Sequence, residues 1–466
     1  MSSTFSGLST ALNALMAQRQ ALDVAGQNIA NVNTPGYTRQ RAELEPVVAA
    51  GRGGLYAVAQ EPGWGVMVTD VSRLADALVD ARQRGAHASQ ANLNDVSTTY
   101  TAIEQLMNEP STTGLSSQLT AFWAAWHDVA NNPGDVSTRA ALLAKAQTVT
   151  GTLNSSAQQL TSYWSTQRDQ AVALVNDVNT TAQSVAQLNQ QITNAKLSGG
   201  QANELSDQRD QLVLHLSELT GATSRANSDG SVDVMVGGSP LVHGPHAERL
   251  ILGGATAVDQ TSSTPVSFSW AGGGVASVSG GRLAASLQAL NTTIPGVLAS
   301  YDSVATTLAS TVNAAHDTGQ DLDGNPATDF FTSTGTVTAA TISVAITDPR
   351  KVASAVPSGT ANLDGSLADR IAQLATSTTG ADKVWSTAVS SVGVDSNRAA
   401  TQATTAASVV KNADADRDSA SGVSLDEELT GMLTYQRAYE GASRLLTALD
   451  QNLDTLINRT GIAGRA

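Results

Sequence analysis

The sequence predicts a mainly α-helical protein with β-rich insertions: terminal N- and C-helices forming a coiled-coil layer, a body of long bundled helices and a small outer β domain. Three observations predict this fold class. Leucines recur with heptad spacing at both ends of the chain, and apolar residues recur with helical spacing through most of the middle. Between residues 221 and 281, apolar and polar residues alternate and Gly and Ser become frequent, which indicates strands and turns.

The composition fits a helical scaffold better than a compact enzyme. Of 466 residues, only 4% are aromatic and 14% are charged, and the length favours two to four domains. The formal net charge of -15 would repel nucleic-acid phosphates, so nucleic acid is not an expected partner. The absence of cysteine removes disulfides, thiolate catalysis and cysteine-based zinc sites.

The start of the chain lacks the features of a cleavable signal peptide. Its first thirty residues contain neither a basic segment nor a continuous apolar run. No stretch reaches membrane-spanning length, so we expect no membrane insertion. If the protein leaves the cytoplasm, its export route must read a different signal.

A heptad-spaced apolar stripe predicts a helix that begins close to residue 1. Only Arg19 and Asp23 are charged before Arg39, so this helix has little charged surface to keep it in water alone, and we expect it to pack against a partner. The residues predicted to form this part of an assembly interface are Leu8, Leu12, Leu15, Leu22 and Ile29.

The first helix is expected to end near Asn31. Pro35 disfavours helical geometry at Thr34, and Pro35 and Gly36 suit the two central positions of a type II turn. Charged residues alternate with Gln, Ala and Leu from Arg39 to Glu45, which predicts a strand with one charged face.

A second amphipathic helix is predicted at the C-terminal end. Ser424 and Glu427 have the spacing of a capping box, so the helix should begin there. A second apolar stripe, from Tyr435 to Leu456, lies beside the first, and two adjacent stripes imply at least two neighbours. The first stripe, also assigned to the assembly interface, contains Leu425, Leu429, Met432, Tyr439, Leu446, Leu453 and Ile457.

Two interpretations of the ends remain open. An intramolecular hairpin could simply tie the termini together, but two helices with this much apolar surface would be under-buried. Self-assembly would cover the rest. We therefore expect residues 1–69 and 418–466 to form a terminal coiled-coil assembly domain with an adjoining extended segment.

The middle of the chain predicts a helical body with inserted β segments. Helical spacing runs over 70–108, 115–129, 137–197, 205–219, 282–316 with an interruption at Pro295, and 381–412. Trp123, Trp126 and Trp164 are interpreted as core residues. The body domain is expected to span 70–220 and 282–417, with a β-like segment near 332–356, and the outer β insertion to span 221–281.

Motif searches predict no catalytic, cofactor-binding or metal-binding residues. His243 and His246 are two possible metal ligands without a third, and a surface turn is the preferred interpretation. The segment from Asp321 to Asp329 fails the EF-hand pattern at Pro326, which leaves Asx turns as the main explanation and a looser cation site open. An extracellular enzyme or carbohydrate-binding module in the β insertion remains a weaker alternative, because no acid pair, metal set or nucleophile stands out there.

Both ends carry signatures that resemble those of bacterial flagellar axial proteins, the rod and hook family. The N-terminal motif contains Asn28, Asn31, Thr34, Pro35, Gly36 and Tyr37, and the C-terminal one contains Tyr435, Gln436, Ala438 and Tyr439 after an acidic triplet. The sequence from Tyr37 to Gln40 and the segment "GWGVMVTDVSR" from Gly63 are similar to the hook-associated proteins of the hook-filament junction. Hook and distal-rod proteins are the nearest alternatives.

The resemblance implies a non-enzymatic structural subunit that self-assembles into a short ring between hook and filament. It implies the hook protein and the next hook-associated protein as axial partners. It also implies export through the flagellar type III apparatus with a dedicated chaperone, and an extracellular location on the flagellum without a cleavable signal peptide.

Overall fold

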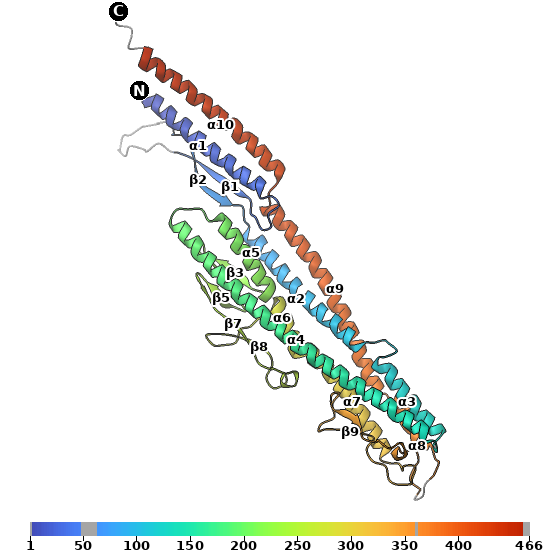
Figure 1. The fold of residues 1–466 in the computed structure, drawn as a ribbon. Helices are drawn as coiled ribbons and strands as arrows, with labels where there is room; N and C mark the ends of the chain where they lie inside the picture. Colours follow the sequence, from blue (N-terminus) through green and yellow to red (C-terminus); the bar gives the residue numbers. More distant parts are fainter. Residues whose placement is uncertain (1, 48–62, 359–361, 460–466) are drawn as a thin grey trace, which may run out of the picture.

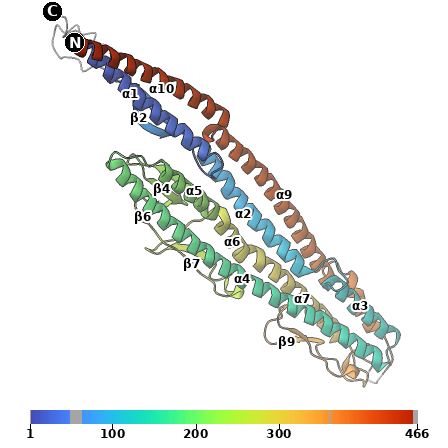
Figure 2. The same ribbon diagram turned by 45° about the horizontal axis from the view of Figure 1, so that its top comes forward.

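The computed structural model describes residues 2–47, 63–358 and 362–459. The molecule is elongated and mostly helical, with small antiparallel sheets, so the predicted fold class is confirmed at that level. Both ends of the chain lie at one tip, where the first and last helices run side by side (Figures 1 and 2). The body extends away from this tip.

The terminal unit consists of two helices and a two-stranded ribbon. Helix α1 (Ser2–Ala30) lies antiparallel to α10 (Leu425–Asp454), as the direction of the chain in Figure 1 shows. Strand β1 (Gln40–Pro46) pairs antiparallel with β2 (Val66–Arg73), and this ribbon packs on α1. The small cluster that joins these elements contains Ala21, Val24, Ala42 and Val71, with Tyr435 and Val68 against it.

The body is built on a pair of long helices. Helices α2 and α9 pack along one another (Figures 1 and 2), and α9 continues through Gly422 into α10. Side-chain caps define two of the starts, since Asp76 accepts from the amide of Leu78 and Asp135 from that of Ser137. The body helices are α2 (Ala77–Met107), α3 (Leu115–Asn131), α4 (Val136–Leu197), α5 (Asn203–Thr220), α6 (Gly281–Gln288), α7 (Ile294–His316), α8 (Ser366–Ala372) and α9 (Ala381–Ser421). Short 3-10 turns cover Val258–Gln260, Pro349–Lys351 and Gln373–Thr376, and π-helical segments cover Ala289–Thr293 and Thr455–Arg459.

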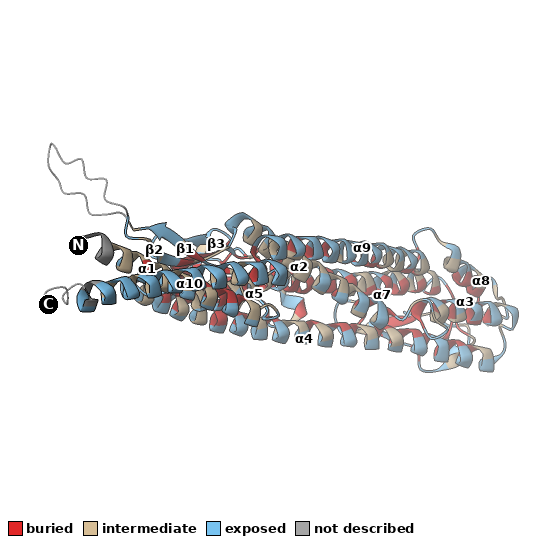
Figure 3. Cartoon of the chain, turned by 90° about the horizontal axis from the view of Figure 1, so that it is seen from above, coloured by how far each residue is buried: buried red, intermediate tan, exposed pale blue. Residues whose placement is uncertain are grey.

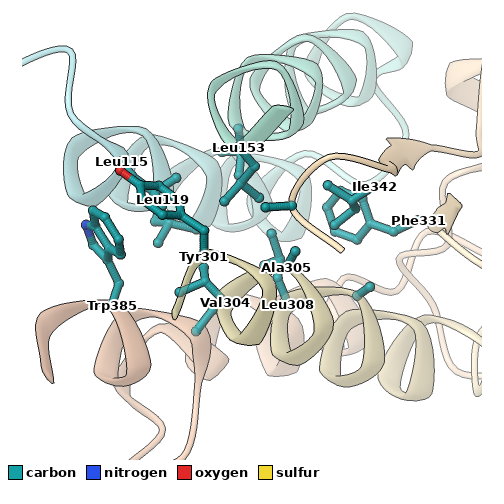
Figure 4. Packing of buried hydrophobic residues seen from close by; sticks show 14 of the residues in the cluster. Leu115, Leu119, Leu153, Tyr301, Val304, Ala305, Leu308, Phe331, Ile342 and Trp385 are labelled. Atoms are coloured by element: carbon teal, nitrogen blue, oxygen red, sulfur yellow. The ribbon is translucent and has the colours of Figure 1, made fainter. Parts of the chain in front are cut away.

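Aromatic side chains fill the core at the end of the body far from the termini. Trp126 and Trp164 are fully buried and Trp123 nearly so, which confirms their predicted role. Figure 4 shows Leu115, Leu119, Tyr301 and Trp385 meeting between α3, α7 and α9. Burial of this aromatic and aliphatic surface gives the body its own hydrophobic stabilisation, independent of the terminal unit.

A second core lies between α4, α5 and the β insertion. One sheet has the order β3 (Thr223–Ala226), β4 (Val232–Val236), β5 (Ser239–His243), β6 (His246–Ala247), and β7 (Leu250–Gly253) pairs with β8 (Ser267–Trp270). The alternating valines of β4, Val232, Val234 and Val236, are buried in this core, so the predicted β-rich insertion is present.

Asparagine side chains hold the β segments on the helices. Asn189 of α4 accepts from the Val232 amide at 3.0 Å and donates to the Val232 carbonyl at 2.8 Å. Asn179 makes the same reciprocal pair with Leu250. Each asparagine side chain makes the two hydrogen bonds that a neighbouring strand would make. It therefore provides partners for backbone groups that would otherwise be buried without them.

Several predicted elements differ from the structure. Residues 66–73 form β2 and α2 begins at Ala77, so the helix predicted from residue 70 starts too early. Val71 and Leu74 fit helical spacing, but Val71 pairs with Ala42 of β1 and the Leu74 amide donates to the Arg39 carbonyl, so both residues lie outside α2. The interruption predicted at Pro295 is a local change of helix type, because the π-helical segment Ala289–Thr293 directly precedes α7 and the chain is helical on both sides.

Three of the predicted domain boundaries fall inside elements, whereas the one after residue 220 coincides with the end of α5. The boundary after residue 69 falls inside β2, and the one after residue 417 falls inside α9. The β-like segment near 332–356 contains β10 (Ile342–Val344) and the last two residues of β9 (Phe331–Ser333), which pair with each other. Parts of the predicted terminal domain, residues 48–62 and 460–466, lie outside the described residues.

Candidate assembly interface

A tight turn after α1 directs the chain from the terminal helix into the ribbon. The Tyr37 amide donates to the Thr34 carbonyl at 3.2 Å, and Gly36 has φ +78° at the third position, as a type II turn requires. A Cβ on Gly36 would lie 1.4 Å from Gln211 Nε2 of α5. The predicted turn is therefore present, and glycine is needed for both its conformation and its close approach to the body.

Asn28 is the centre of the hydrogen bonds around this turn. Its side chain is buried, accepts from Tyr37 Oη at 2.9 Å and from the Gln40 amide at 3.0 Å, and donates to the Gln40 carbonyl at 2.8 Å. The same amide donates to Glu428 Oε2 of α10 at 3.1 Å. One residue of the N-terminal signature thus joins α1, the turn, β1 and α10.

Arg39 connects β1 with the start of α10. Its guanidinium donates to Glu428 at 2.6 Å and to Glu427 at 2.5 Å, and its backbone amide donates to the Ser421 carbonyl at the end of α9 at 2.9 Å. Ser424 is the N-cap residue of α10, as predicted, but its hydroxyl accepts no hydrogen bond from the first turn of the helix. The predicted capping box is wrong because the Glu427 carboxylate binds Arg39 instead.

Buried ion pairs attach this joint to α5 of the body. The Thr38 amide donates to Asp207 at 3.2 Å, and Arg73 of β2 pairs with Asp207 at 2.7 Å and Asp210 at 2.8 Å. Burial raises the pKa of Asp207 although Arg73 lies beside it, and burial with the nearby charges of Asp207 and Glu204 raises the pKa of Tyr37 to about 12. The contacts here are polar, in contrast to the two apolar cores of the body.

The face of α1 that packs against α10 is formed by small residues. A Cβ on Gly7 would lie 3.3 Å from Leu449, Tyr435 packs on the cluster that contains Ala21, and Asn28 binds Glu428. Gly7 and Asn28 are three heptads apart on α1, and their partners Leu449 and Glu428 are three heptads apart on α10. The contacts between the two helices therefore repeat with heptad spacing. From residue 6 onward, where the burial of α1 is described, its buried residues are Ala11, Ala17, Ala21, Val24, Ala25 and Asn28.

The predicted leucine stripe of α1 is therefore not its buried seam within one chain. Leu8, Leu15, Leu22 and Ile29 are half-buried, Leu12 is 45% exposed, and the neighbouring Met16, which lies outside the predicted stripe, is 62% exposed. Heptad spacing identified an apolar face correctly, but small residues with the same period occupy the seam facing α10.

The predicted stripe of α10 is covered unevenly. Met432, Leu446 and Leu453 are half-buried, whereas Tyr439, which lies seven residues from both Met432 and Leu446, is 39% exposed, and Gln436 is exposed. Figure 3 shows the exposed colour over much of α10 and the buried colour in the body. The side chain of Leu456 lies outside the described residues. Leu425, Leu429 and Leu433 are each between 45% and 52% exposed, and we call them the outer stripe of α10. Leu425 and Leu429 belong to the predicted stripe, and Leu433 does not.

Among the residues that the structure describes, no group of three or more His, Asp or Glu side chains is arranged to hold a metal ion. His243 and His246 face each other at the exposed turn between β5 and β6. Asp321 accepts from the amides of Asp323 and Asn325 and pairs with Lys351, so turn contacts use this carboxylate. In the part of the chain the structure describes, no helix is apolar over a length sufficient to span a membrane.

Three protein-family models match separate parts of the chain. The model described as flagellar hook-associated protein FlgK helical domain matches residues 100–331. The ends match models of rod proteins: residues 8–38 the flagella basal body rod protein, and residues 417–459 the C-terminal region of flagellar basal body rod FlgEFG protein.

Relatives with established names are similar over the whole chain or most of it. The flagellar hook-associated protein 1 of Bacillus subtilis is 29% identical, with all of both chains aligned. That of Salmonella typhimurium is 30% identical over 69% of this chain and 58% of the relative, and that of Escherichia coli is 28% identical over 70% and 59%.

A solved structure has the same fold. The flagellar hook junction protein FlgK from Burkholderia pseudomallei superposes with a TM-score of 0.62, covering 72% of this chain and all of that one. Its sequence identity is 18%, so this likeness concerns the fold.

Proposed function

Because the chain belongs to the flagellar hook-associated protein 1 family, a family of structural and non-enzymatic flagellar proteins, we propose how it acts as a subunit of the hook-filament junction. In this proposal the terminal helices assemble with those of neighbouring copies. The assembled helices form the coiled-coil layer that the heptad spacing predicts.

One observation carries this proposal: a single chain leaves apolar surface uncovered on both terminal helices. Leu12 and Met16 of α1 and the outer stripe of α10 are all more than 40% exposed, although the body cores are densely filled. Exposed apolar stripes of this kind mark sites of protein association, because covering them removes apolar surface from water. Of the interface residues assigned from sequence, Leu12, Leu425 and Leu429 belong to these exposed stripes.

The proposed axial partners bind above and below this layer. We propose that the hook protein binds on one side and the next hook-associated protein on the other, and that copies of this chain contact one another within the ring. The subunit would reach this extracellular position through the flagellar type III apparatus, without a cleavable signal peptide and with a dedicated export chaperone.

The proposed division of labour follows the sequence-based domains. Residues 1–69 and 418–466 form the assembly domain, residues 70–220 and 282–417 the helical body, and residues 221–281 an outer insertion. The polar joint at Asn28, Arg39 and Asp207 supports a boundary between assembly domain and body, because hydrogen bonds and ion pairs replace a continuous apolar core there.

A hook or distal-rod protein would share the same terminal mechanism, since both ends match rod-family models. The match of residues 100–331 to the hook-associated helical domain favours the junction.

A charged residue placed on the exposed apolar surface of α1 or on the outer stripe of α10 tests the proposal. We expect Leu12→Asp and Leu429→Asp to leave the purified monomer folded but to abolish filament formation when either variant replaces the native subunit in cells. Val275→Asp, at a 76% exposed position of the β insertion, is the matched control and should support normal filaments. Filaments of normal length with both stripe variants would overturn the proposed role of the stripes.

A further inference from the structure

Glu428 is a buried carboxylate at the inner, polar end of the α1–α10 contact. Its residue is 5% exposed, and its two oxygens bind Asn28 and Arg39. We propose that this carboxylate sets the register of α10 against α1. This role goes beyond the proposed function, which requires only that the helices present apolar stripes.

The apolar contacts by themselves do not specify one register. The contact face of α1 repeats small residues at heptad spacing, among them Gly7, Ala14 and Ala21. A shift of α10 by one heptad would place Ala442 opposite Gly7 or Ala21 instead of Ala14, and large residues would again lie over small ones. The hydrophobic contribution changes little, because it depends on buried area and not on which side chains supply it.

The polar contacts exist in one register alone. After a one-heptad shift, the Glu428 carboxylate would face either Ala21 or the end of α1, away from the Asn28 amide, and would lose its pairing. A buried charge without partners is strongly destabilising, whereas the paired one is satisfied by Asn28 and Arg39. A single buried polar group is a known means of fixing register between helices with a uniform apolar seam.

The register determines which surface the pair offers to neighbours. Seven residues at about 1.5 Å each correspond to a displacement of about 10 Å. Such a shift would move the outer stripe of α10 along α1, so that Leu429 and Leu12 no longer kept their relative positions. Under the proposed function, a slipped pair would be a folded subunit that cannot join the ring.

Cysteine cross-linking can measure the register directly because the native chain contains no cysteine. Ala442→Cys is combined in turn with Ala14→Cys, which reports the native register, and with Gly7→Cys or Ala21→Cys, which report the two one-heptad shifts. Disulfide yields are measured on the full-length monomer under mild oxidation. Each pair is tested in the native background and with Glu428→Met, a substitution that leaves Arg39 paired with Glu427.

The matched control is Glu427→Met. Glu427 also binds Arg39, but its side chain is 63% exposed and it makes no contact with Asn28 in the described structure. Circular dichroism and tryptophan fluorescence confirm that the body remains folded in every variant. Arg39→Met, which removes the other charged partner, is the second test variant.

In the native chain and in Glu427→Met we expect the Ala14 pair to exceed the shifted pairs about tenfold or more, as a charge-assisted buried hydrogen bond implies. In Glu428→Met the shifted pairs should rise relative to the Ala14 pair, although Arg39 still binds Glu427, and Arg39→Met, which removes both ion pairs, should move the yields in the same direction. An unchanged pattern in Glu428→Met would overturn the proposal. Loss of all three cross-links would also overturn it, because Glu428 would then attach α10 without selecting its register. The yields are independent of filament formation, so they test the register even if the proposed assembly role fails.

Discussion

The side-chain amide of Asn28 donates to the carboxylate of Glu428 at 3.1 Å, although 400 residues separate them in the sequence. The bond closes the terminal unit at its inner end, where α1 enters the turn and α10 leaves α9. The entire body is therefore inserted between the two halves of one small unit. That unit depends on the most distant contacts in the chain and should form last during folding.

The turn after α1 requires glycine at position 36. We expect Gly36→Ala to destabilise the protein by about 1 to 3 kcal/mol, because alanine is strained at φ +78° and its Cβ would collide with Gln211. Gly85→Ala is the matched control, since Gly85 lies inside α2 and a Cβ there would meet no neighbouring side chain or helix within 4 Å, and it should stabilise by up to about 1 kcal/mol. Urea unfolding of both variants gives the comparison. Equal effects of the two substitutions would contradict the structure of the turn.

The reciprocal pairing of Asn189 with Val232 predicts a local effect on the β insertion. Asn189→Ala should cost about 1 to 3 kcal/mol, because it leaves a buried backbone amide and carbonyl without partners. Hydrogen exchange should show the loss of protection concentrated in residues 223–247. Asn176→Ala, at an exposed position of the same helix, should be neutral or slightly stabilising. A loss of protection spread equally over α2 and α9 would argue against this assignment.

The ion pairs of His87 predict that the free energy of unfolding falls at alkaline pH. Its ring bridges Glu218 of α5 and Asp414 of α9, each at 2.9 Å, and mainly the hydrogen bond to Glu218 raises its pKa from 6.5 to about 9. Because the folded state holds the proton more tightly than the unfolded state, this stabilisation is complete below pH 6.5 and is lost as the pH rises through about 9.

Urea midpoints measured across this range test the prediction. The native protein should lose stability as the pH rises, and His87→Gln should show a much smaller loss. His246→Gln, at an exposed turn of the β insertion, should retain the native pH dependence. A native midpoint that stays constant through pH 9 would contradict the proposed bridge.

Local patterns predicted the elements whose own residues determine them. The end of α1 followed from Pro35 and Gly36, and the 62-residue α4 followed from its apolar spacing and from Pro133 before it. The β insertion followed from the alternation of Val232, Val234 and Val236. In these cases residues close in sequence determine whether the segment is a helix, a strand or a turn.

The errors arose where a distant residue decides the outcome. Glu427 suits a capping box in sequence, but Arg39 binds it in the folded chain. Heptad spacing revealed the leucines of α1, but periodicity does not say whether α10 covers the leucine face or the small-residue face. Val71 fits a helix until β1 supplies a strand partner. The partners of Asn28 at the candidate site, above all Glu428 and Gln40, could not be identified from spacing, although Glu428 belongs to the acidic triplet of the C-terminal signature.

Hydrogen exchange of the monomer and of the assembled protein tests the central claim most directly. We expect amides in residues 8–29 and 429–453 to exchange faster in the monomer, where α1 and α10 cover only part of each other's apolar surface, than after assembly, while α4 and α7 are protected in both states. The body helices serve as the internal reference. Strong and equal protection of the terminal helices in the monomer, with no further change on assembly, would contradict the claim that copies of this chain must cover them.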